Sequence, residues 1–294
     1  MMDKTKSLPT TSEEAKEYAC FYTTRIKTID ETTREKQESE AFLKTNMPDD
    51  IQDFHRKQLD GLNKLLLDDD YLNGNYHQGI DPILFELIEW RAMFYAFQSV
   101  TIDPQPFDQH AFFQQWKVGG AYAMYSSLGK LLSRNRQDKS LRKLWWDIMD
   151  FVQDTEDLEE VKYISEQLDE NSERFSNKGS KALFFRNKVV AHNEKSIDAD
   201  LKHLDEDIRI LARVWSIITM WSAFPMMFPF RENSQAFSAL ESFYSPEDLT
   251  RLKSKRQEYL DLVTSWCKTN LITNQEEKRS PFGSLSVSIS VASK

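Results

Sequence analysis

An arginine, an asparagine and a histidine lie close together in the central part of the sequence. Asn187 follows Arg186 directly, and His192 comes six positions after the arginine. Arginine presents a planar fork of N–H donors that suits a phosphate group, and histidine can exchange a proton near neutral pH. These side chains could therefore cleave an RNA phosphodiester bond, with His192 as general acid or base and Arg186 stabilising charge on the phosphate.

This stretch is a basic island in an acidic protein. Between positions 174 and 192 there are basic residues and no aspartate or glutamate, whereas the whole chain has a net charge of -9. A non-specific nucleic-acid coat needs the opposite overall sign, because neutralised phosphates supply most of such binding. A local basic site can still bind nucleic acid, because a cleft focuses the electric field of the charges that line it. We therefore expect substrate contacts from Lys178, Lys181 and Lys188.

The spacing sets a geometric condition on such a site. We expect a helix from about Lys181 to His192, and positions six apart on a regular helix differ in direction by about 120°. Arg186 and His192 would then not share a face. A working site needs either local unwinding near Ala191 or a second copy of the chain across a two-fold axis.

An ordinary structural explanation competes with the catalytic one. Arg186 could form an ion pair with the acidic segment 147–170. Without such a pair, the charges of that segment are typical of a helix face exposed to solvent. His192 could cap the C-terminus of a helix, where a partly positive imidazole is favoured.

Other chemistries have little support in the sequence. No two histidines have metal-ligand spacing, and no nucleophile elbow or phosphate-binding glycine loop is present. Cys20 and Cys267 lie far apart and have no recognisable catalytic or metal-binding setting, which is typical of a reducing compartment. We expect a cytoplasmic protein that needs no cofactor and no metal.

The composition and the apolar spacing predict an all-α protein. Glycine and proline are scarce, at 8 and 9 residues, and apolar residues recur at helical spacing. We expect an N-terminal helical extension over 1–80, a helical bundle over 81–270, and a polar, disordered tail over 271–294. One helix is predicted from Thr11 to about Leu43. Its nearly all-polar part after Ile29 is predicted to be an exposed arm or to pair with a partner.

Three local patterns refine this expectation. Asp81-Pro82 and Ser245-Pro246 predict helix starts, with Asp81 and Ser245 as N-caps. Gly119-Gly120 predicts a close approach of two helices, because no strand precedes the pair. The uncharged stretch 214–230 is short for a bilayer span and contains two prolines, which favours a buried core helix over a membrane segment.

The run from Phe185 to Asn193 resembles the signature of the HEPN superfamily. That signature is an arginine, commonly followed by asparagine or aspartate, and then a histidine after about four to six residues on the penultimate helix of a bundle. The form found here is most similar to the abortive-infection U-type HEPN-like proteins of bacteria. The resemblance covers about residues 80–230, and its specific part is positions 186–192.

The resemblance implies a HEPN-type bundle that dimerises through the motif helices and cleaves RNA without a metal, in phage defence or as a toxin. Arg186 and His192 would be catalytic, and Asn187 would assist or hold the arginine. RNA and a second copy would be partners, with an antitoxin or another protein as a further candidate. The extension 1–80 and the acidic charge depart from the family pattern. The alternative is a non-catalytic module that binds RNA, a nucleotide or a protein.

Overall fold

The computed structural model describes most of the chain and shows an all-α protein in these parts, as predicted. The only strand-like pairing among the described residues is an isolated bridge between Thr269 and Glu276. The described residues are 8–45, 48–76, 79–107, 110–135, 138–154, 156–176, 178–187, 201–222, 235–238 and 240–276.

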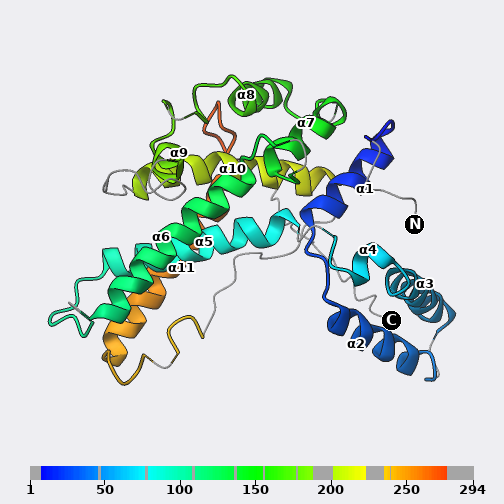
Figure 1. Cartoon of the computed structure of the whole chain (residues 1–294), viewed down its shortest axis with the longest axis horizontal. Helices are drawn as coiled ribbons and strands as arrows, with labels where there is room; N and C mark the ends of the chain where they lie inside the picture. The colour runs from blue at the N-terminus through cyan, green and yellow to red at the C-terminus, as the bar shows by residue number, and fades with distance from the viewer. Residues whose placement is uncertain are drawn as a thin grey trace, which may run out of the picture.

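Eleven helices lie within these ranges (Figure 1). Their bounds are α1 Ser12–Thr23, α2 Ile29–Phe42, α3 Asp49–Leu65, α4 Asp69–Leu72, α5 Ile80–Ser99, α6 Ala111–Leu131, α7 Leu141–Val152, α8 Leu158–Leu168, α9 Lys181–Phe185, α10 Leu201–Ser222 and α11 Pro246–Lys268.

The prediction of one helix from Thr11 to Leu43 is wrong, because the chain breaks between α1 and α2. Thr24 has an extended backbone after α1. Thr28 then starts α2 with a capping box, in which its side chain accepts from the Glu31 N–H and the Glu31 carboxylate accepts from the Thr28 N–H. This second start signal falls inside the stretch that was expected to be continuous.

The two halves of the N-terminal region have different surroundings. α1 packs against α7 and α10 and buries Ala15, Ala19 and Tyr22 in the main core. α2 and α3 pack chiefly on each other, at the lower right of Figure 1, away from α5, α6, α10 and α11. The part predicted to be an exposed arm is therefore α2, one helix of a hairpin with α3 that α4 closes at its base. Tyr71 of α4 donates its hydroxyl hydrogen to the Lys27 carbonyl at 2.8 Å.

The centre of the molecule is built from α5, α6, α10 and α11. α10 is buried on most sides, which agrees with the core helix expected at the start of 214–230. None of the helices in the described ranges combines the length and apolar character that crossing a bilayer requires. Residues 223–230, with both prolines, lie outside the described residues.

The two helix starts that the sequence predicted have different outcomes. Ser245 caps α11 as expected, with its side chain accepting from the Asp248 N–H. Asp81 is not an N-cap, because α5 begins one residue earlier and Gly79 occupies the cap position with a φ of 87°. The Asp81 carboxylate instead accepts a hydrogen bond of 2.7 Å from the Trp215 indole, which joins α5 to α10.

The glycine pair in α6 is a close-approach site at only one of its two positions. A Cβ built on Gly120 would lie 2.5 Å from the Phe94 ring and 2.7 Å from the Trp90 ring of α5. The same atom built on Gly119 would meet nothing within 4 Å. Gly120 therefore lets two aromatic rings of α5 rest on the α6 backbone.

Candidate cationic site

The motif residues follow a short helix that is fixed firmly to α10. Ser180 caps α9 by accepting from the Leu183 N–H at 3.0 Å, and it donates its own hydroxyl hydrogen to Asp207 at 2.5 Å. Arg174 donates to the other oxygen of Asp207 at 2.7 Å. Burial raises the pKa of Asp207 to about 6, although the bonds from Ser180 and Arg174 act in the opposite direction.

The helix leaves regular α geometry at the motif itself. α9 ends at Phe185, and Arg186 and Asn187 lie in a π-helical turn directly after it. The expected regular helix from Lys181 to His192 is therefore wrong at these two residues. Such turns are rare and often occur at functional sites. Ala191, where local unwinding is one of the two alternatives, lies outside the described residues.

Arg186 packs across the backbone of α6 and is held there by its neighbour. A Cβ built on Gly129 would lie 2.5 Å from Arg186 Nε, so this side chain occupies the space that a larger residue would need. Arg186 Nη1 donates to Asn187 Oδ1 at 2.7 Å. Among the described residues Arg186 forms no ion pair, so the alternative pairing with segment 147–170 is not observed there.

Three arginines from separate parts of the chain surround one cavity beside α9. The cavity has a volume of about 320 Å³ and opens where α6, α7 and α9 come together. Arg186 and Asn187 are the two residues of the sequence motif that line this cavity. The other lining residues are Gly129, Leu132, Ser133, Arg134, Arg142, Phe175, Ser176 and Leu183.

Arg134 and Arg142 are the site residues that sequence reasoning missed. Both arginines belong to a basic run over 130–143, which was the sequence signal that could have found them. No pattern in one sequence shows that this run folds against Arg186 and Asn187. Arg142 is buried and donates to the carbonyls of Leu168 and Asp169, where α8 ends. Arg134 is exposed and donates to the Phe175 carbonyl at 3.2 Å.

The two arginines repel each other across the cavity wall. Burial lowers the pKa of Arg142, and the nearby positive charge of Arg134 lowers it further, whereas the carboxylates of Asp169 and Glu170 act in the opposite direction. A bound anion would relieve this repulsion and gain charge-assisted hydrogen bonds from planar guanidinium groups. The arrangement is therefore suited to hold a phosphate group.

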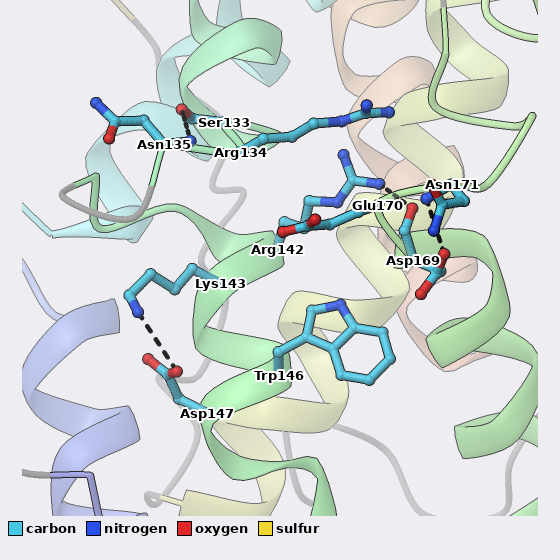
Figure 2. A pocket seen from close by; sticks show the side chains of 10 residues that line it. All are labelled: Ser133, Arg134, Asn135, Arg142, Lys143, Trp146, Asp147, Asp169, Glu170 and Asn171. Carbon is cyan, nitrogen blue, oxygen red and sulfur yellow. Dashed lines mark hydrogen bonds and ion pairs between the residues drawn. The ribbon is translucent and has the colours of Figure 1, made fainter.

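A second cavity adjoins the first and shares Ser133, Arg134 and Arg142 with it. It has a volume of about 440 Å³, and Figure 2 shows its lining side chains. Lys143 and Trp146 of α7 form one part of the wall, and Lys143 lies 3.6 Å from Asp147. The remaining lining residues are Asn135, Asp169, Glu170 and Asn171.

Two further predicted site residues, Lys178 and Lys181, do not line these two cavities. Both lysines are exposed near the start of α9. Lys188 and His192 lie outside the described residues, so the distance between Arg186 and His192 stays open. Their assigned roles stay predictions.

Metal-binding groups and relatives give no further lead. Within the described ranges, no three His, Cys, Asp or Glu side chains gather in a way that could hold a metal ion. Cys267 is buried, which raises its pKa to about 12, and neither cysteine is in a disulfide. Comparison with family models, curated proteins and solved structures finds no match for this chain.

Proposed function

We propose that the protein is a metal-independent endoribonuclease of HEPN type, acting in the cytoplasm in phage defence or as a toxin. The observation that carries the proposal is the convergence of Arg134, Arg142 and Arg186 on one cavity in a chain of net charge -9. Asn187 supports it further, because its side chain holds the Arg186 guanidinium at the edge of that cavity.

The proposed reaction uses the ribose hydroxyl of the RNA itself. The 2′-oxygen attacks the neighbouring phosphorus, the bond to the 5′-oxygen breaks, and a 2′,3′-cyclic phosphate forms. The 2′-OH loses a proton and the leaving 5′-oxygen gains one. His192 carries out one of these two transfers, and solvent water carries out the other. Arg186 donates hydrogen bonds to the phosphate oxygens as charge builds up on them.

RNA cleavage in the presence of a chelator tests the proposal. Wild type should cleave RNA with EDTA present, and Arg186→Ala and His192→Ala should each slow cleavage at least 100-fold. Lys253→Ala is the matched control, because it removes a positive charge from an exposed position on α11 and should leave the rate unchanged. Intact RNA with wild type, or equal rates for all four proteins, would contradict the proposal.

We further propose that the active form is a homodimer in which Arg186 of one subunit works with His192 of the other. Mixing Arg186→Ala and His192→Ala subunits then creates one dimer site with both residues intact, so activity should return although each variant alone is inactive. Light scattering should show the dimer. A monomer, or no recovery after subunit exchange, would rule out a shared site.

A second candidate is a non-catalytic module that binds a protein through the α2–α3 hairpin. Its supporting observation is that α3 is strongly amphipathic but buries only Leu62, while Phe54 is 63% exposed. Recovery of one defined partner by wild type and its loss with Phe54→Ser would support this candidate. Phe112→Ser is the matched control, because Phe112 is equally exposed on α6. Equal recovery by both variants would oppose the candidate.

A further inference from the structure

Trp146 is an exposed aromatic ring held in a fixed orientation beside the arginine cavity. The residue is 41% exposed, yet its indole N–H donates to the Leu168 carbonyl at 3.1 Å. Arg142 Nε donates to the same carbonyl at 2.7 Å. The ring therefore has no unsatisfied donor, and it lines the 440 Å³ cavity below Arg142 in Figure 2.

Basic and acidic side chains both line this second cavity. Arg134 and Arg142 belong to the wall shared with the Arg186 cavity. Asp169 and Glu170 follow α8, and their negative charges act to raise the pKa of Arg142. The Asp169 carboxylate also accepts from the Asn171 backbone N–H at 2.8 Å. Carboxylates repel a phosphate but accept hydrogen bonds from the N–H groups of a base. The phosphate therefore belongs at the arginine wall, and the apolar face of Trp146 is left for a flat, uncharged group.

We propose that the second cavity binds a nucleobase of single-stranded RNA, stacked on Trp146, while the adjoining phosphate lies between Arg134 and Arg186. This inference rests on the proposed function, because it names the part of the substrate that lies next to the reacting phosphate. Every base has a flat π-face, so a tryptophan can hold a base without reading its identity. A duplex would keep its bases stacked on each other, which makes a single strand the substrate.

Affinity for an RNA analogue that cannot be cleaved separates this subsite from catalysis. A fluorescein-labelled single-stranded oligonucleotide with 2′-O-methyl groups lacks the attacking hydroxyl and reports binding alone. Trp146→Ala should weaken its binding by about 5- to 150-fold, the range for loss of one base–aromatic stack. Trp146→Phe keeps an aromatic face and should retain most of the affinity. Phe112→Ala is the control for losing an exposed ring and should bind like wild type.

An oligonucleotide without bases identifies the interaction that is lost. Trp146→Ala should bind this abasic strand as well as wild type does, because the phosphates remain and no base can stack. Circular dichroism checks that the variants are folded. Leu168 still accepts from Arg142 in both Trp146 variants, so the end of α8 keeps its hydrogen bond.

The outcomes for the subsite and for the enzyme are distinguishable. Unchanged affinity of Trp146→Ala, equal loss on the abasic strand, or no binding by wild type would overturn the subsite. If RNA is cleaved and Trp146→Ala has no effect, the ribonuclease proposal stands and the subsite fails. If the analogue binds through Trp146 and RNA is never cleaved, the base subsite stands and the catalytic proposal fails.

Discussion

Arg186 lies so close to Gly129 that a Cβ built on the glycine would be 2.5 Å from Arg186 Nε. The glycine comes from α6, and the arginine follows α9, so two distant parts of the chain meet without a side chain on one of them. The direction in which the guanidinium points therefore depends on a residue that carries no charge and has no functional group.

Gly129→Ala should reduce RNA cleavage at least tenfold while the protein stays folded. The added methyl group displaces the guanidinium from its place over α6, although the charge of Arg186 is kept. An alanine inside a helix also gains up to about 1 kcal/mol over glycine, which offsets part of the steric cost. The check is kcat/KM together with the thermal midpoint, and Gly119→Ala, which meets nothing, serves as the control. Wild-type cleavage by Gly129→Ala would show that the placement of Arg186 does not matter.

The neighbouring glycines of α6 should respond to alanine in opposite directions. Gly119→Ala should raise the free energy of unfolding by up to about 1 kcal/mol, because the helix gains propensity and nothing is displaced. Gly120→Ala should lower it by about 1–3 kcal/mol, because the methyl group would overlap the Trp90 and Phe94 rings. Urea denaturation measures both. A gain for both variants would mean that α5 and α6 are farther apart than described.

Glu160→Ala should destabilise the protein by about 3–5 kcal/mol. Glu160 and Arg213 are both 2% exposed and are joined by two hydrogen bonds of 2.9 and 2.6 Å, so the variant leaves a buried guanidinium without its counter-ion. The exposed pair Asp53–Arg56 gives the comparison, since Asp53→Ala should cost under about 1 kcal/mol. Denaturant midpoints at pH 7 measure the difference. Equal losses for the two variants would show that burial does not decide the cost.

Asp81→Asn should stabilise the protein at pH 7.5 and have little effect at pH 4. Burial raises the pKa of Asp81 to about 6, against a hydrogen bond from Trp215 that lowers it. The folded state therefore holds this proton more tightly than the unfolded state, and the stability present below about pH 4 is lost as pH rises through 6. Asparagine keeps an acceptor for the Trp215 indole and carries no charge.

Denaturation across pH 4–8 checks this sign. The variant should be more stable than wild type by about 1–2 kcal/mol above pH 7, and the two curves should converge as the pH falls. A variant that is less stable at every pH would mean that the ionised carboxylate is favoured in the folded protein. The neighbouring change Glu86→Gln, on the same helix, controls for loss of one negative charge.

The secondary structure of the described regions was largely readable from local patterns. Ser180, Ser140 and Ser245 start helices as N-caps, because short hydroxyl side chains satisfy the free N–H groups of a first turn. The same logic applied to Thr28 and Glu31 would have found the break between α1 and α2. Asp81 misled the prediction because its partner, Trp215, lies more than a hundred residues away.

Only part of the candidate site could be predicted from the sequence, because several of its residues lie far apart along the chain. Arg186 and Asn187 were found because they are neighbours with a recognisable spacing to a histidine. Arg134, Arg142 and Trp146 come together with them only through the packing of α6, α7 and the segment after α8. Gly129 was missed as well, because its importance lies in the side chain that it leaves room for.

The separate packing of α2 and α3 has a consequence for how the molecule opens. A hairpin that rests mostly on itself can unfold while α5, α6, α10 and α11 stay closed, so its amide hydrogens should exchange with solvent through a subglobal opening. The amides of α10 should instead be released only when the whole core unfolds. Hydrogen exchange followed over time would then show weaker protection of the α2 and α3 amides than of the α10 amides. A partner that binds to the hairpin would increase the protection of the α2 and α3 amides alone.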